Sequence, residues 1–447
     1  MAKHAQFWCV VFIVLGAASL CWCIYRDLHI EKQYPGDLRN RVVGARMQLD
    51  GLSPYFHHWK PAEGFRYYDW DNYSPTLKVS NATATPFFHQ LLYPLANLSQ
   101  RTISRIWMVL EYLVLATMTL LAWRMTKTRK QKYAAWFTGL FFLHTYAWLT
   151  NVEMGQLYIF IPFFALIFYN ALIRKANLLN ACIAGASAMA LVLVRPNTML
   201  LLLPFVLLVA KFSLRYKLVF GIAAFVCLAV AFGSRSSRFY WSDYLEAMKE
   251  QVKLHQELGP AVQQNLPVPL FENFEGWNRT RMEIANKFPF YKHSGEHGNM
   301  FVLLNSALHV KTPVWVLSAL CASFIVLLCW LYFKKYKPVS FEPFSIALLG
   351  SCLYMTSDLF SPVHRFLYNG AFWIFPLLLV ASCYSASVSK LSVAGIVAGM
   401  LLNSLPVGLF PMQHSLGEYV MFAAFLHILL FSKPDINPEK KQSSLRI

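Results

Sequence analysis

The chain has 447 residues, of which 57% are hydrophobic and only 14% are charged. Soluble globular proteins carry about 25% charged residues, so this composition excludes an ordinary soluble enzyme and indicates a protein that crosses a membrane many times. The formal net charge is +18, but the basic residues are scattered between apolar stretches. Membrane lipids, including phosphate-bearing ones, are therefore better partners for this charge than nucleic acid, which we do not expect to bind.

Several kinds of enzyme site have no support in the sequence. It contains no GxxxxGK[ST] loop, no HExxH motif, no GxSxG elbow and no glycine-rich dinucleotide loop. The nine cysteines fall in or at the edges of apolar stretches, so they indicate neither a disulfide framework nor a zinc site. ATP hydrolysis, zinc proteolysis and acyl-serine chemistry are therefore not expected.

Apolar stretches long enough to cross a bilayer, about 20 residues each, occur about twelve times. They lie at roughly 6–25, 105–123, 134–150, 157–173, 178–194, 197–211, 217–233, 312–333, 341–356, 366–384, 390–409 and 417–432. This pattern predicts an all-α polytopic membrane protein that forms a single transmembrane domain over residues 1–447.

The distribution of basic residues predicts the topology. If the N-terminus is cytoplasmic, every short cytoplasmic connection holds Lys or Arg, as at 124–132 and 334–337. The short outer connections around 151–156 and 410–416 hold none. By the positive-inside rule, we expect a multi-pass protein of the plasma or inner membrane with both termini in the cytoplasm.

Two long polar segments, 26–104 and 234–311, then fall on the outer side. Each is too long for a simple linker, which favours a functional role. The second holds an amphipathic helix candidate at 241–258. We expect interfacial helices in both segments, and we expect the first segment to be the catalytic loop.

A short helix is predicted at the start of the first segment. After the Pro35-Gly36 break, apolar and polar residues alternate at helical spacing up to the Asp50-Gly51 turn. Its expected apolar face holds Leu38, Val42, Ala45 and Leu49, and its polar face holds Arg39, Asn40, Arg46 and Gln48. Such a helix is suited to lie in a membrane interface.

Asp37, at the head of this helix, is the candidate catalytic residue. A carboxylate at the membrane surface is well placed to act as a general base toward a sugar hydroxyl. The alternative is that Asp37 only caps the helix, because Asp is a favoured cap residue. Asp50, before Gly51, is better interpreted as a turn residue.

Basic side chains at the outer ends of later spans are candidates for binding phosphate. Arg195 lies between two apolar stretches, and His364 and Arg365 lie in a short outer connection. Guanidinium groups bind phosphate with two hydrogen bonds at once. Alternatively, these side chains contact lipid headgroups or pair with Asp358 or Glu153.

Polar and aromatic side chains of the outer segments are candidates for binding sugar. Glu153 and Gln156 lie in the shortest outer connection and could bind hydroxyls, although a plain polar turn explains them nearly as well. Tyr55 and Trp59 begin an aromatic stretch that reaches Tyr73. Aromatic rings stack on sugars, but an interfacial aromatic belt is the commoner explanation.

Five short motifs follow one another in the order seen in a known family. They are Asp37 after a Pro-Gly break, the LDGLSPY segment ending at Tyr55, Thr85-Pro86-Phe87-Phe88, Gly155-Gln156, and Ser361-Pro362-Val363-His364. Together they resemble the GT-C glycosyltransferases, and within these the polyprenol-phosphate-mannose-dependent α-mannosyltransferases. The resemblance covers residues 34–380. It departs at Leu157, where the family has Asn, and only Gly298-Asn299-Met300 corresponds to the family's GNQS-like element.

The resemblance implies a fold, a reaction and roles for the site. A GT-C enzyme has about 12 transmembrane helices and transfers a sugar, here a hexose and in this group mannose, from a polyprenyl-phosphate donor. The acceptor would be a glycan or glycolipid on the outer face. Asp37 would deprotonate the acceptor, with inversion at the anomeric carbon. The donor phosphate would be held by His364, Arg365 and Arg195, and the substrates would also contact Glu153, Gln156, Tyr55 and Trp59. No cofactor and no divalent metal is required.

Other classes remain open at this point. A transporter or flippase of lipid-linked substrates would show broken helices with mid-membrane charges and repeat symmetry, and the sequence shows neither. A non-catalytic assembly subunit would not need Asp37. Among the transferases, a lipid-linked pentose or hexosamine donor is a further alternative.

Overall fold

A computed structural model of the chain describes most of its residues. The described ranges are 2–31, 36–57, 66–67, 82–233, 235–257, 299–308, 312–336, 342–363, 365–383, 388–405 and 412–432. Within these ranges the secondary structure is helical throughout, with no strand. The predicted all-α class is therefore confirmed for the part of the chain that the structure describes.

The helices follow one another along the chain in two halves. The first half holds α1 (Ala2–Glu31), α2 (Gly36–Leu49), α3 (Pro86–Leu91), η3 (Tyr93–Leu95), α4 (Gln100–Met125), α5 (Arg129–Phe142), α6 (Tyr146–Met154), α7 (Phe160–Ile173), α8 (Leu178–Val194), η4 (Pro196–Thr198), α9 (Met199–Leu202), η5 (Leu203–Phe205), α10 (Val206–Val209) and α11 (Leu214–Phe232). The second half holds α12 (Arg235–Glu257), α15 (Met300–Leu308), α16 (Val314–Lys335), α17 (Pro343–Leu359), η8 (Leu367–Trp373), α18 (Ile374–Cys383), α19 (Lys390–Leu402) and α20 (Gln413–Phe431).

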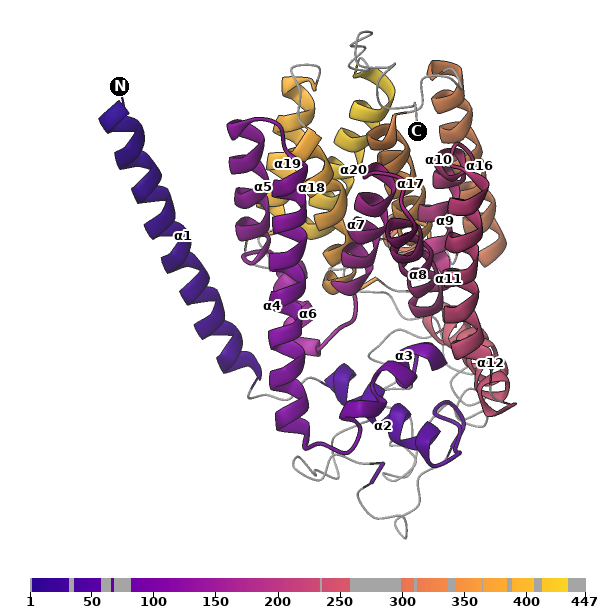
Figure 1. Cartoon of the computed structure of the whole chain (residues 1–447). Coiled ribbons are helices and arrows are strands. Elements are labelled where there is room, and N and C mark those ends of the chain that lie inside the picture. The colour runs from indigo at the N-terminus through magenta and orange to yellow at the C-terminus, as the bar shows by residue number, and fades with distance from the viewer. Residues whose placement is uncertain are drawn as a thin grey trace.

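The long helices form a bundle with roughly parallel axes, and the short helices α2 and α3 lie across one end of it together with α12 (Figure 1). We call this the loop end of the bundle. Helix α1 meets the bundle near the loop end, where it contacts α4, α5 and α6, and its N-terminal part leans away (Figure 1). Among the described residues, the small helical layer lies at this end of the bundle.

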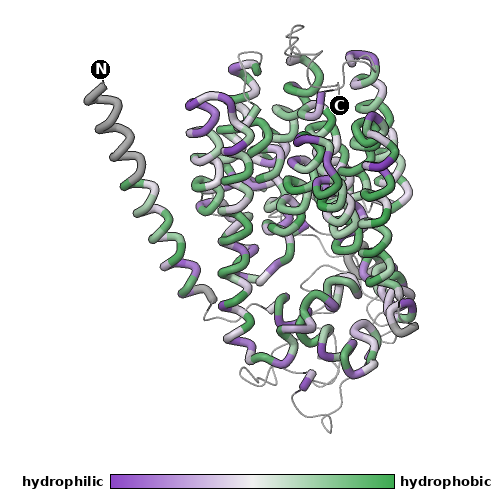
Figure 2. Tube along the Cα trace, viewed as in Figure 1, coloured by the Kyte–Doolittle hydropathy of each residue, from purple (hydrophilic) through white to green (hydrophobic). Residues whose placement is uncertain are grey.

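Four helices in the described ranges are long and apolar enough to cross a membrane: α4, α11, α16 and α20. Five shorter apolar helical stretches accompany them. The bundle is mostly apolar along its length, whereas polar residues are frequent at the loop end (Figure 2). Large apolar side chains such as Phe225 of α11 and Trp315 of α16 are exposed, as expected for a surface that faces lipid. A membrane protein is therefore supported, while the count of about twelve spans stays a prediction.

The helix starts follow from local sequence. Ser99 caps α4 by accepting a hydrogen bond from the Thr102 amide. Thr128 and Gln131 form a reciprocal capping box at the start of α5. Each such cap contributes about 1 kcal/mol, and together they fix where the bundle helices begin.

The predicted helix after the Pro-Gly break is α2. Its predicted apolar positions Leu38, Val42 and Ala45 are buried, but other positions of the predicted faces are wrong. Asn40 and Gln48 are buried, whereas Leu49 is 43% exposed. Because α2 packs against α3, η3 and α6, its polar residues find partners inside the protein, and the Tyr93 hydroxyl donates to Gln48 Oε1 at 3.0 Å. Helix α2 is therefore largely covered by protein at the loop end.

The two long polar segments meet at the loop end. Helix α12, from the second segment, packs on α3 from the first. The Ser53 hydroxyl donates to Asp243 of α12, and the rings of Tyr55 and Tyr244 lie 5.8 Å apart. The described parts of the two long segments thus pack together in one layer.

Candidate active site

The Asp37 carboxylate lies in the first turn of α2 and is half-buried. Its Oδ2 accepts a hydrogen bond from the Gln156 side-chain amide. These two residues come from separate sequence motifs 119 positions apart. The fold therefore brings together the predicted base and one of the predicted sugar-binding residues.

A tight turn directs Gln156 toward α2. Gly155 ends α6 in the left-handed conformation, with φ 59°, which favours glycine. The Gly155 amide donates to Val152 O at 3.1 Å and the Gln156 amide to Asn151 O at 2.8 Å. This is a Schellman motif. It explains structurally why glycine precedes Gln156.

Arg41 completes the group, although nothing in the sequence singles it out. It is buried on α2, and its Nη1 donates to Gly155 O at 3.0 Å while its Nη2 donates to Gln156 Oε1. The Gln156 amide therefore presents its oxygen to Arg41 and its nitrogen to Asp37. We call these three residues the Asp37–Gln156–Arg41 cluster.

Helix α3 packs against α2 and supports this cluster. Thr85 caps α3 through the Phe88 amide, and its hydroxyl donates to Leu193 O at 2.7 Å. The Phe88 ring lies 6.0 Å from the Arg41 guanidinium carbon. The Thr-Pro-Phe-Phe motif thus tethers α3 to α8 and supports Arg41.

His89 holds the backbone of α2. Its Nδ1 lies 2.9 Å from Arg41 O, and because a carbonyl only accepts, Nδ1 carries the hydrogen. Burial lowers the pKa of His89 to about 4, so the ring stays neutral near pH 7. His89 therefore positions the segment of α2 that carries Arg41.

Two tyrosines connect the cluster with Arg195. The Tyr368 hydroxyl interacts electrostatically with Asp37, Arg41 and Arg195. The rings of Tyr158 and Tyr368 lie 5.0 Å apart, and the Arg195 guanidinium carbon lies 4.4 Å from the Tyr158 ring. Sequence reasoning missed both tyrosines, because single aromatic residues in apolar stretches carry no signal.

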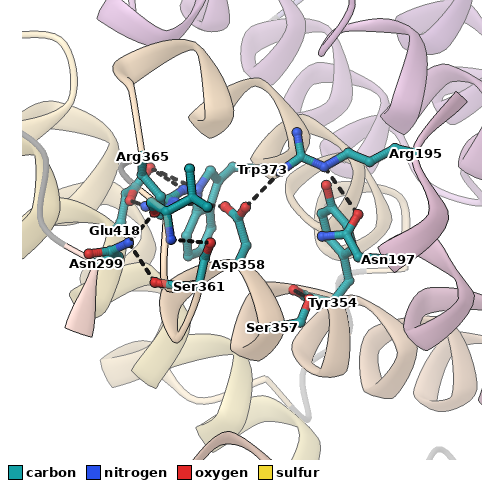
Figure 3. A network of polar contacts seen from close by, with 11 residues as sticks. Arg195, Asn197, Asn299, Tyr354, Ser357, Asp358, Ser361, Arg365, Trp373 and Glu418 are labelled. Carbon is teal, nitrogen blue, oxygen red and sulfur yellow. Dashed lines mark hydrogen bonds and ion pairs between the residues drawn. The ribbon is translucent and has the colours of Figure 1, made fainter. Parts of the chain in front are cut away.

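Arg195 and Arg365 converge on one carboxylate (Figure 3). Arg195 Nη2 donates to Asp358 Oδ1 at 3.1 Å, and Arg365 Nε donates to Asp358 Oδ2 at 2.6 Å. Arg195 Nε also donates to Asn197 Oδ1 at 3.1 Å. Pairing of these arginines with Asp358 was the structural alternative to a phosphate role, and the structure contains it.

Arg365 is buried, and all three of its nitrogens are bonded. Both Nη atoms donate to Glu418, which also accepts from Trp373 Nε1 at 3.1 Å. Two guanidinium groups and two carboxylates therefore balance in charge, as a buried ionic group requires. A role for Arg365 in binding donor phosphate stays a prediction.

Asn299 connects the second long segment to this network. Its Nδ2 donates to Ser361 O at 2.9 Å and to Val363 O at 2.6 Å, and its Oδ1 accepts from the Val302 amide at 3.0 Å (Figure 3). Asn299 thus fixes the backbone of Ser361 and Val363, just before Arg365.

The remaining predicted site residues differ in their surroundings. Tyr55 is fully buried, and its hydroxyl donates to Ala84 O at 2.6 Å, so it supports the layer. Glu153 is half-buried in the last turn of α6 and forms no hydrogen bond or ion pair with another described residue. His364 and Trp59 lie outside the described residues.

Asp50 behaves as the expected turn residue. Arg66 forms an ion pair with it, and the Tyr67 hydroxyl donates to it at 2.8 Å. The hydrogen bond from Arg66 lowers the pKa of the Asp50 carboxyl. In the described ranges, no three His, Cys, Asp or Glu side chains gather as a metal site would need. The sequence-based expectation about metals is therefore not tested.

The apolar helical bundle and the polar cluster at its loop end define a membrane protein with a candidate catalytic carboxylate. The model of glycosyltransferase family 87 matches residues 83–362, which is more than half of the chain. The chain therefore belongs to glycosyltransferase family 87. No curated protein and no solved structure matches it.

Membership of this family settles the class of activity. The protein is a glycosyltransferase, so it uses a sugar donor and an acceptor. The resemblance to membrane glycosyltransferases is confirmed, and the transporter alternative is not favoured. The narrower assignment to mannosyltransferases is not tested by the match.

Proposed function

We propose that this protein transfers a hexose, namely mannose, from a polyprenyl-phosphate donor to a glycan or glycolipid acceptor on the outer face of the membrane. The observation that carries the proposal is the bond between Gln156 and Asp37. It holds a half-buried carboxylate at the start of a helix, in a family that transfers sugars.

Asp37 acts as the general base. A helix N-terminus favours the charged form of a carboxylate, and the Gln156 amide fixes its direction. The acceptor hydroxyl oxygen attacks the anomeric carbon while its proton passes to Asp37. The bond from that carbon to the phosphate oxygen breaks, and its electron pair leaves with the polyprenyl phosphate.

Inversion requires the acceptor and the leaving phosphate to lie on opposite faces of the sugar. Tyr158 lies against Arg195 and beside Tyr368, and Tyr368 interacts with both Asp37 and Arg195. We place the acceptor at Asp37 and the phosphate at Arg195, an arrangement that corresponds to an inverting transfer.

Arg195 and His364 hold the departing phosphate. Arg195 Nη1 takes part in neither the Asp358 bond nor the Asn197 bond. The Arg365 nitrogens already bond to carboxylates, so the main role of Arg365 is to position Asp358. Arg365 can bind the phosphate only if its hydrogen bonds to Glu418 break. Charge on the phosphate is then neutralised by side chains, without a divalent metal.

Gln156 holds the base, and Glu153 binds a sugar hydroxyl. Glu153 lies in the last turn of α6, just before Gly155 and Gln156, and has no hydrogen-bond partner among the described residues. Tyr55, being buried, and Trp59, outside the described residues, keep the sugar-stacking role only as predictions from the sequence.

The test is sugar transfer by the purified, detergent-solubilised protein with labelled polyprenyl-phosphate mannose. Donor release and product formation are both followed for the wild type and for Asp37→Asn. We expect the variant to fold and to bind the donor without turning it over. Turnover equal to the wild type would remove Asp37 as the base. No turnover by the wild type, with mannose, pentose and hexosamine donors all tried, would remove the polyprenyl-phosphate donor.

A further inference from the structure

A carboxyl group is buried in the middle of α4, outside the cluster described above. Glu111 and Asn151 of α6 are both 0% exposed, and Asn151 Nδ2 donates to Glu111 Oε1 at 2.7 Å. From the sequence we expected no charged residue within a span, and Glu111 in the middle of α4 corrects that expectation. An ionisable residue inside a membrane-spanning helix is costly and usually has a function. The Glu111–Asn151 pair is therefore a candidate for a second role in the site.

Each member of the pair has one oxygen left over. Glu111 Oε2 and Asn151 Oδ1 are buried and accept no hydrogen bond within the described residues. If Glu111 is ionised, both atoms are acceptors, and neither can satisfy the other. A single proton on Glu111 Oε2 would satisfy both atoms, because the hydroxyl could donate to Asn151 Oδ1. The oxygen of this hydroxyl could still accept from the indole of Trp107, whose Nε1 is also buried without a partner among the described residues and which interacts with Glu111.

We propose that Glu111 is held as a neutral carboxylic acid that forms two parallel hydrogen bonds with the Asn151 amide and thereby positions the Asp37–Gln156–Arg41 cluster. In this pair, Oε1 accepts from Asn151 Nδ2 and the Oε2 hydroxyl donates to Asn151 Oδ1. The effect of the Glu111–Asn151 pair on catalysis rests on the proposed function of Asp37. The protonation of Glu111 does not depend on that function.

The charges around Glu111 agree with a neutral acid. The charged groups that face it are Asp27 of α1 and Arg41 of α2. Asp27 is fully buried, where it forms an ion pair with Arg26 at 2.8 Å and accepts hydrogen bonds from Tyr112 and Trp148. A second carboxylate beside this pair would have no cation of its own. Arg41 already donates to Gly155 O and Gln156, and so offers Glu111 no ion pair at hydrogen-bond distance.

The Glu111–Asn151 pair is connected to Asp37 through the backbone turn from Asn151 to Gln156. Asn151 O accepts from the Gln156 amide at 2.8 Å, and the Gln156 side chain donates to Asp37. Glu111 therefore fixes the end of α6 relative to α4, and this fixes the direction of the amide that holds Asp37. Glu111 is a positioning residue, because it acts only through Asn151 and Gln156.

The experiment compares Glu111→Gln with Glu111→Leu in detergent. Gln reproduces the neutral acid, because its oxygen accepts from Asn151 Nδ2 and its nitrogen donates to Oδ1. Leu removes both bonds at similar size. Met118→Leu, a buried change on the same helix, is the matched control. Infrared spectra detect the carbonyl stretch of a protonated carboxylic acid, and turnover is measured with polyprenyl-phosphate mannose.

We expect a carboxylic acid band in the wild type that is absent from Glu111→Gln. Glu111→Gln should keep turnover, whereas Glu111→Leu should lose about 10²-fold in kcat with KM little changed, as expected when a catalytic group is misplaced by about 1 Å. Met118→Leu should behave as the wild type does.

Two results would overturn the inference. One is a wild-type spectrum identical to that of Glu111→Gln in the carboxylic acid region. The other is a Glu111→Gln variant as inactive as Glu111→Leu. If Glu111→Leu does not fold, the carboxylic acid band of the wild type and the turnover of Glu111→Gln still test the inference. If the wild type turns over no donor, the proposed function fails while the band still tests the pair.

Discussion

The ring of His89 fills the space that a side chain at residue 44 would need. A Cβ added to Gly44 would lie 2.3 Å from His89 Cε1 and 2.6 Å from its Nδ1. Both residues are buried, so neither can turn away into solvent. Glycine at this position lets α2 and α3 approach closely enough for His89 to hold the Arg41 carbonyl.

Gly44→Ala should therefore destabilise the protein. Overpacking a buried contact costs about 1–3 kcal/mol, although alanine for glycine inside a helix would alone stabilise by about 1 kcal/mol. We expect a lower midpoint of thermal unfolding in detergent. Gly221→Ala in α11, where the new Cβ meets nothing within 4 Å, is the matched control. Equal midpoints for the two variants would refute this account of α2 and α3.

His89 should also make stability depend on pH. The unfolded side chain has a pKa near 6.5, and the folded one about 4. Between these values the unfolded state binds a proton that the folded state does not, so stability falls as pH falls from 6.5 to 4, by about 3 kcal/mol in full. Denaturation midpoints across this range measure it. His89→Asn keeps a donor for Arg41 O and should flatten the slope; an unchanged slope would contradict the assignment.

Two of the three cluster residues could be found from the sequence, and the third could not. Asp37 follows a Pro-Gly break and Gln156 follows a glycine, so each is marked by local chain geometry. Arg41 has no such mark. It lies between the polar and apolar positions of a helix that was expected to face lipid on one side, and it is buried because protein surrounds α2. Periodicity predicts the helix but not what covers each of its faces.

The predicted phosphate-binding residues show the same limit of prediction from sequence. Arg365 was identified because a guanidinium group in a short outer connection suits phosphate, but its partner Glu418 lies 53 residues further along. The two meet because α20, which carries Glu418, packs against α17, the helix that precedes Arg365. A sequence shows that a buried charge needs a partner, whereas the choice between a carboxylate and a substrate phosphate depends on tertiary contacts.

Gln156→Glu tests the contact with Asp37 by itself. The new carboxylate can still accept from Arg41 Nη2, but it has no donor for Asp37 and places a like charge beside it. We expect kcat to fall about 10²-fold with donor affinity unchanged, measured with labelled polyprenyl-phosphate mannose. Gln131→Glu, which keeps the capping box of α5, controls for the added charge. A Gln156→Glu enzyme with wild-type kcat would show that Gln156 does not orient the base.

Asn299→Asp tests the link between the second long segment and the phosphate side. The substitution keeps size and the acceptor for Val302, but it removes both donors and turns an anionic oxygen toward Ser361 O and Val363 O. Leaving these half-buried carbonyls unpaired costs up to about 1–3 kcal/mol each, so the segment before Arg365 should move. We expect lower thermal stability and about a tenfold rise in the donor dissociation constant, equivalent to about 1.4 kcal/mol. Asn97→Asp, at an exposed position, should change neither quantity. If Asn299→Asp binds donor as tightly as Asn97→Asp does, the Asn299 bonds serve stability alone and the coupling to donor binding is wrong.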